Sequence, residues 1–155
     1  MMDAPFWTSI PFLIIVLIAS STGAIFRPGA WYRDLDKPGW TPPDWVFPIV
    51  WAVLYVLMAY AAWRVWDLDG VRLPLALWGA QLALNALWSA LFFGMRRVGL
   101  AFAGLVALWL AVAATTIAFA QIDPLSGVLL LPYILWVTIA GALNFSILRR
   151  QRSPA

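Results

Sequence analysis

Uncharged apolar segments alternate with short charged ones along this chain of 155 residues. Five segments of 19 to 25 residues carry no charge at all: 4–26, 45–63, 73–95, 98–122 and 124–148. A helix needs about 20 apolar residues to cross a bilayer of roughly 30 Å, so each segment is long enough to span one. The ten-residue alternating pattern of a membrane barrel is absent. The pattern therefore predicts an all-α integral membrane protein, a five-transmembrane-helix bundle that forms a single domain over residues 1–155.

Composition agrees with a membrane protein, because 64% of the residues are hydrophobic and only 11% are charged. Soluble domains carry about 25% charged residues. The small residues of ASSTGA at 19–24 resemble a signal-peptide cleavage site. However, Asp3 is the only charged side chain before this apolar run, whereas a signal peptide begins with basic residues. We therefore expect a retained first span.

The Lys and Arg residues predict how the bundle is oriented. The side holding the 27–44 loop and the C-terminus has eight of them: Arg27, Arg33, Lys37, Arg96, Arg97, Arg149, Arg150 and Arg152. The other side has Arg64 and Arg72. Because basic residues concentrate in cytoplasmic loops, the 27–44 loop and the C-terminus are expected in the cytoplasm and the N-terminus outside. This topology accounts for the net charge of +3, and no nucleic-acid partner is expected.

The third span has two contrasting faces. At 100° per residue, Gln81, Asn85 and Trp88 fall within about 60° of one another. Amides in lipid need partners, so this face is expected to point into the bundle, where Gln81, Asn85 and Trp88 are expected to contribute to a ligand site. The opposite face is a groove of small residues: Gly79, Ala83, Ala86 and Ala90. Such a groove packs a helix of the same monomer or of a second copy, and its outward direction favours a homodimer.

Two other spans carry stripes of rings. The second span has Phe47, Trp51 and Tyr55 four residues apart, and the fifth span has Tyr133, Trp136, Ala140 and Asn144 at spacings of three and four. Ordinary core packing is one interpretation of these stripes. The other is a shared pocket, since rings that flank a small residue such as Ala140 leave room for a flat guest.

The connection 27–44 is rich in proline and tryptophan, and its prolines prevent a long helix. We expect its rings and the neighbouring Trp45 to fold over the bundle as a lid; the alternative is that they rest in the headgroup layer. The rings in question are Trp31, Trp40 and Trp45. Arg33 and Lys37 are expected to meet an anionic group on a guest, or to pair with Asp34, Asp36 or phospholipid.

Several motifs together resemble one family, the translocator proteins or tryptophan-rich sensory proteins (TspO/MBR). They are WY at 31–32, KPGWTPPDWVFPIVW at 37–51, ALNALW at 83–88, FFGMRR at 92–97 and PYILWVTIAGALNF at 132–145. They cover the long loop and the second, third and fifth spans in the order and spacing of that family. The chain length and the five spans agree as well.

The resemblance implies a five-helix bundle, commonly a dimer, with a pocket closed by the first loop. Family members bind porphyrins and, in animals, cholesterol and synthetic benzodiazepine or isoquinoline ligands. By position, the implied pocket residues are Trp40, Phe47, Trp51, Tyr55, Asn85, Trp88, Trp136 and Ala140. Tryptophans matching Trp31 and Trp136 are implicated in light-dependent porphyrin breakdown in some relatives. The sterol motif of animal members reads Leu143, Phe145 and Arg149 here, with Phe145 in place of tyrosine.

These observations favour a membrane receptor or translocator that binds porphyrins or other flat hydrophobic molecules. Stacked Trp and Tyr rings suit a porphyrin ring, and Arg33 or Lys37 suits its carboxylates. The chain has no His and no Cys, so we expect no metal site, no required cofactor, and free-base porphyrin or haem without such a ligand. The alternative is an oxidative, light-dependent porphyrin-degrading enzyme using Trp31 and Trp136. An ion-coupled carrier is disfavoured because no ionisable residue lies within a span.

Overall fold

The structure is a computed structural model that describes residues 4–26 and 29–152. Within that part every regular element is helical, which confirms the all-α prediction. Along the chain these elements are a 3₁₀ turn η1 (Phe6–Ser9), α1 (Ile10–Ile25), α2 (Ala30–Asp34), α3 (Val46–Asp69), α4 (Leu73–Ser89), a π-helical turn η2 (Ala90–Gly94), α5 (Val98–Ile122), α6 (Pro124–Leu129) and α7 (Leu131–Arg152).

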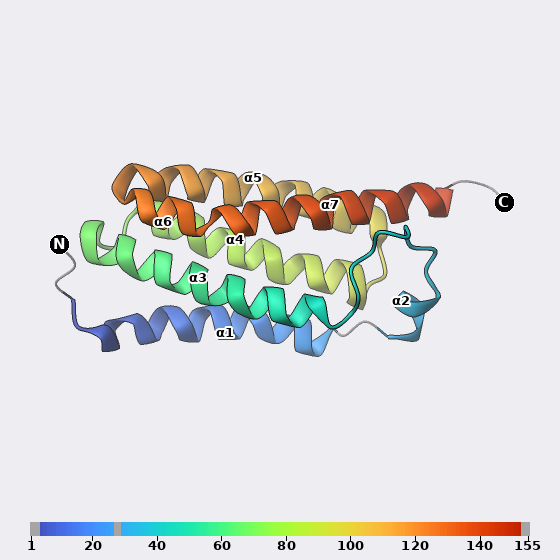
Figure 1. Ribbon diagram of the computed structural model, residues 1–155, viewed down its shortest axis with the longest axis horizontal. Coiled ribbons are helices and arrows are strands. Elements are labelled where there is room, and N and C mark those ends of the chain that lie inside the picture. Colours follow the sequence, from blue (N-terminus) through green and yellow to red (C-terminus); the bar gives the residue numbers. More distant parts are fainter. Residues whose placement is uncertain (1–3, 27–28, 153–155) are drawn as a thin grey trace.

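The five predicted spans are confirmed. The helical stretches long and apolar enough to cross a membrane are Phe6–Ile25, Val46–Asp69, Leu73–Gly94, Val98–Ile122 and Pro124–Gln151. They lie side by side along the long axis of the molecule, so that α1 begins and α7 finishes at opposite ends (Figure 1). The chain is therefore an integral, multi-pass membrane protein.

The second span differs from its prediction at its C-terminal end. It was expected over 45–63, but α3 continues to Asp69 and carries Arg64 within the helix. The guanidinium of Arg64 donates to the carboxylate of Asp123, with Nε 2.6 Å from Oδ2 and Nη2 3.1 Å from Oδ1. Because the partner neutralises it, the charge does not end the helix, and the connection to α4 shortens to residues 70–72.

The third and fifth spans are not uniform α-helices. At the end of α4 the backbone widens into the π-turn η2, where the N–H of Met95 donates to the carbonyl of Ala90 at 2.8 Å. The fifth span was expected as one helix over 124–148. It is divided at Leu130, because Pro132 has no N–H to donate to the preceding turn.

Helix α5 forms the back of the bundle and packs against α4 and α7. Its buried side chains recur at alternating spacings of three and four residues, which turns one continuous stripe toward its neighbours. They include Ala101, Leu105, Leu108, Val112, Thr115 and Phe119. The α5–α6 contact needs glycine at Gly127, where an added Cβ would lie 2.5 Å from the Cβ of Ala120.

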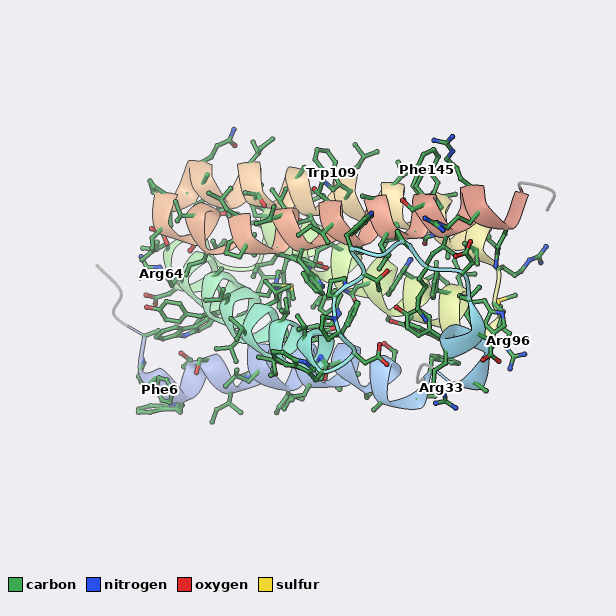
Figure 2. All side chains as sticks on the ribbon, turned by 45° about the vertical axis from the view of Figure 1, so that its right-hand side comes forward. Phe6, Arg33, Arg64, Arg96, Trp109 and Phe145 are labelled. Atoms are coloured by element: carbon green, nitrogen blue, oxygen red, sulfur yellow. The ribbon has the colours of Figure 1, made fainter. Side chains whose placement is uncertain are left out.

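Charged side chains gather at the two ends of the bundle. Figure 2 shows Arg33 and Arg96 at one end and Arg64 at the other. Arg27 lies outside the described residues. We call the end that holds α2 and η2 the lid end, and the end that holds Arg64 and Asp123 the far end.

Candidate functional site

A cavity of about 850 Å³ lies among the helices toward the lid end. Four spans contribute to its lining, together with the lid, which we define as residues 29–44. The lining residues are Leu13, Val16, Leu17, Ser20, Gly23, Ala24 and Phe26 around α1; Tyr32 and Asp44 in the lid; Phe47, Pro48, Trp51, Ala52, Tyr55 and Val56 on α3; Asn85, Trp88, Ser89 and Phe93 on α4 and η2; and Trp136 and Ala140 on α7. The volume falls within the usual range for small-molecule sites, roughly 300–1,000 Å³.

The ring stripes on α3 and α7 meet at this cavity. The rings of Trp51 and Tyr55 are stacked, with centroids 5.4 Å apart and planes 29° from parallel. Phe47 meets the edge of Trp136 at 5.5 Å. Ala140, one helical turn beyond Trp136, also lines the space. The arrangement gives the cavity flat aromatic walls beside a small residue.

A chain of hydrogen bonds holds the ring-bearing helices together behind this wall. The hydroxyl of Tyr55 donates to Oδ1 of Asn85 at 3.2 Å, and Nδ2 of Asn85 donates to the hydroxyl of Tyr133 at 3.0 Å. Tyr133 in turn donates to Oε1 of Gln81 at 2.8 Å, and Nε2 of Gln81 lies 3.6 Å from Sδ of Met58. Asn85 and Gln81 are buried, so the polar face of α4 points inward as predicted. Of these hydrogen-bonded side chains, only Asn85 and Tyr55 belong to residues that line the cavity.

A second, shorter chain fixes the indole of Trp88. Its Nε1 donates to Oδ1 of Asn144 at 3.2 Å, and Nδ2 of Asn144 donates to the carbonyl of Val98 at 3.0 Å. The Trp88 ring is also stacked on Phe92 at 5.3 Å. Asn144 is thus buried behind Trp88 and does not line the cavity. Gln81, Tyr133 and Asn144, expected as lining residues, are supports of that lining.

The lid covers the cavity with Tyr32. This side chain is buried and meets the edges of the Phe92 and Phe93 rings at 6.2 and 5.5 Å. Burial raises the pKa of Tyr32, and the negative charge of Asp44 raises it further, so the phenol is neutral at physiological pH. Trp31 also packs against Phe92, at 5.7 Å, but does not contribute to the lining.

Trp40 of the lid and the neighbouring Trp45 do not cover the cavity. Trp40 and Trp45 are 51% and 67% exposed, and neither contributes to the lining. The expectation that all three rings fold over the bundle is therefore wrong for these two. Their exposure is what rings resting in the headgroup layer require, since they are too apolar to be left in water.

The lid charges pair differently from the prediction. Nζ of Lys37 donates to the carbonyl of Tyr32 and lies 4.3 Å from the centre of its ring. Asp36 accepts from Nη1 of Arg150 at 3.0 Å, which ties the lid to the end of α7. Arg33 is exposed at the lid surface. Asp44, which is exposed, is one of the residues that line the cavity.

The remaining predicted residues lie away from the cavity. On α4, Ala83 is exposed, while Gly79 and Ala86, and Ala90 at the start of η2, are half-buried. An added Cβ on Gly79 would meet nothing within 4 Å. In the sterol-like motif, Leu143 is buried and Phe145 is 44% exposed beside Phe102. Across residues 4–26 and 29–152, no group of three His, Cys, Asp or Glu side chains is placed to hold a metal ion.

The α1 side of the lining was missed by the sequence analysis. This span contributes Leu13, Val16, Leu17, Ser20 and Gly23, among others. It has no amide and no regular stripe of rings, so nothing marked one of its faces as special. The small residues at 19–24 were a usable signal, because small side chains leave space beside a helix.

Comparison with known proteins agrees with this architecture. The profile of the TspO/MBR family matches residues 9–150. A protein named "Protein CrtK" from Rhodobacter capsulatus is 48% identical over 142 residues, 89% of each chain. A tryptophan-rich sensory protein from Cereibacter sphaeroides is 50% identical over 130 residues, 84% of this chain and 82% of its own. The human translocator protein is 43% identical over 124 residues, 77% of this chain and 73% of its own.

Proposed function

Because this chain belongs to the TspO/MBR family, we propose that it is a membrane receptor or translocator that binds a porphyrin, or a similarly flat hydrophobic molecule, in the cavity beneath the lid. The relatives named sensory protein and translocator protein support a receptor or sensor role. The observation that carries the proposal is the convergence of Trp51, Trp88 and Trp136 from three helices on one space of about 850 Å³.

The walls of the cavity suit a planar aromatic guest. Stacked and edge-on ring contacts are each worth about 0.5–1.5 kcal/mol beyond the area they bury. The chains through Asn85 and Asn144 hold the rings of Tyr55 and Trp88 in place, so little side-chain freedom remains to be lost on binding. Sterol-like and drug-like ligands share this chemistry, with an apolar flat body and few polar atoms.

The charges at the lid end orient such a guest. Asp44 in the lining repels the carboxylates of a porphyrin, and Lys37 is engaged with Tyr32. The carboxylate edge is therefore directed past the lining toward the exposed Arg33. The described basic residues of the lid end outnumber Arg64 and Arg72 at the far end, which supports a cytoplasmic lid and an external N-terminus.

Light-dependent porphyrin breakdown is the second candidate function, and the position of Trp136 in the lining favours it. Titrating purified protein with protoporphyrin in the dark without oxygen, then illuminating in air, separates the two functions. Under binding alone, we expect tryptophan fluorescence to be quenched on titration and the porphyrin spectrum to stay unchanged under light. Bleaching that is lost in Trp136→Phe but kept in Trp109→Phe, an exposed ring on α5, would favour the enzyme. Absence of quenching would contradict both.

We also propose that the small-residue face of α4 joins two copies of the chain. Ala83 is exposed at its centre, and the space beside Gly79 is open, as close approach of another helix requires. Ala83→Trp is expected to convert a dimer to a monomer, measured as mass by light scattering in detergent. Ala107→Trp is the control, because Ala107 is also exposed but lies on α5, and this variant should leave the dimer intact. A wild-type monomer, or a dimeric Ala83→Trp variant, would refute this interface.

A further inference from the structure

The cavity is not closed on the side where α1 and α3 face each other. The lining residues of α3 differ in exposure. Trp51 and Tyr55 are half-buried, whereas Ala52 and Val56 are exposed. Val56 is 59% exposed, and Leu17 on the facing side of α1 is 65% exposed. Both residues line the cavity and are also exposed on the outside of the bundle. The cavity therefore reaches the outer surface between them.

At the far end, η1 and the start of α1 are bound to α3. Nε1 of Trp63 donates to the hydroxyl of Thr8 at 2.8 Å, and Phe12 packs 6.1 Å from the ring of Trp66. The backbone N–H of Ala4 is also bound to this end of α3. These contacts close the seam between α1 and α3 in the half of the bundle away from the lid.

At the lid end, the residue that follows α1 packs against η2 instead. The ring of Phe26 lies so close to Gly94 of η2 that an added Cβ there would be 2.8 Å from it. Helix α1 is therefore held by α3 at one end and by the α4 side at the other. The opening along the seam falls between these two fastenings, next to the lid.

The part of α1 that borders the opening has low helix stability. Ser20, Ser21 and Thr22 donate their hydroxyls to the carbonyls three residues earlier, at 2.8, 2.6 and 2.8 Å. Such back-bonding competes with the helix and bends it. Gly23 follows directly and costs the helix about 1 kcal/mol relative to alanine. This stretch is therefore the part of α1 most easily displaced.

We propose that this lid-side seam between α1 and α3 is the entrance through which a ligand dissolved in the bilayer reaches the cavity. The inference rests on the proposed function, because it concerns the ligand of that site. The lid covers the route from water with Tyr32 and is tied down by the Asp36–Arg150 ion pair. The seam instead faces acyl chains, in which a flat apolar molecule concentrates. The ligands it admits are those that partition into the lid-side leaflet.

A reversible cross-link tests this entrance, because the chain has no Cys of its own. Ser21→Cys on α1 and Ile49→Cys on α3 place thiols at exposed positions outside the lining, on either side of the seam. A bismaleimide with a disulfide in its spacer joins them, and a reductant releases them. Association and dissociation of protoporphyrin are followed in liposomes by stopped-flow tryptophan quenching, before linking, after linking and after reduction.

We expect the cross-link to slow association and dissociation by the same factor, about tenfold or more, because an entrance is crossed in both directions; reduction should restore both rates. Leu110→Cys with Leu135→Cys, at exposed positions on the adjacent α5 and α7, is the matched control and should change neither rate when linked.

Unchanged rates in the seam-linked protein would place the route at the lid and overturn the inference while leaving the site intact. Slower dissociation alone would also overturn it, since the link would then act on the bound state. Failure of the unlinked protein to quench would instead remove the proposed function itself, and the entrance with it.

Discussion

Replacing Asp123 by Asn is expected to lower the free energy of unfolding by about 2–3 kcal/mol, because it removes the negative charge that pairs with the Arg64 guanidinium. The side chains of Arg64 and Asp123 are only 17% and 10% exposed, so water replaces little of the lost interaction. Asp123 also accepts from the backbone N–H and the hydroxyl of Ser126 and so caps α6. The pair therefore joins α3 to the link between α5 and α6.

The same pair predicts a dependence of stability on pH. The hydrogen bond from Arg64, and after it those from Ser126, hold the pKa of Asp123 at about 2, below its usual 3.8. Because this pKa is lowered on folding, the unfolded chain binds the proton more readily than the folded one. The stabilisation is complete above about pH 4 and is lost as the pH falls from about 4 to about 2. Asp123→Asn should lack this component of the acid-induced loss.

Thermal unfolding in detergent, followed by circular dichroism at pH 7 and across the acid range, measures both effects. Asp69→Asn is the matched control, because Asp69 pairs with Arg72 at the same end of the bundle, and that Arg72 is 71% exposed. An exposed pair contributes about 0–1 kcal/mol, so this variant should unfold close to the wild type. Equal unfolding temperatures for the two variants would show that the buried pair does not join the helices as described.

The sequence predicted the parts of the fold that depend on local pattern. The positions of the spans follow from the length of the segments that carry no charge. The inward direction of Gln81 and Asn85 follows from the cost of an unpaired amide in lipid. The meeting of Trp51 and Trp136 at one space was an expectation built on helical spacing and on the family resemblance. The first two of these features need only neighbours a few residues away, or the bilayer, to specify them.

The features that escaped prediction depend on partners remote in the chain. Whether Arg64 ends a helix depends on Asp123, 59 residues later. Asp36 binds Arg150, 114 residues later, and not a neighbouring lid cation. The contribution of α1 to the lining follows from its contacts with α3 at one end and with η2 at the other, which no periodicity in its own residues records. Local spacing therefore indicates which faces are special, and tertiary contacts decide what those faces meet.

The size of the cavity beside α7 gives the second large effect. Ala140 lines the space next to Trp136, so Ala140→Leu inserts a branched side chain where a flat guest would lie. Overfilling a packed site costs about 1–3 kcal/mol, which corresponds to an affinity weaker by roughly five- to 150-fold. Ala142, two residues along the same helix, is exposed and does not line the cavity. Ala142→Leu is therefore a control of identical chemistry on the opposite side of α7.

The most direct test of the ligand site is a dark, oxygen-free titration of the wild type, Ala140→Leu and Ala142→Leu with protoporphyrin, with circular dichroism confirming that all three are folded. If the ligand lies among Trp51, Trp88 and Trp136, affinity falls at least about fivefold in Ala140→Leu and is unchanged in Ala142→Leu. Equal affinity in all three folded proteins would mean that porphyrin binds elsewhere, and that the aromatic space beneath the lid is not its site.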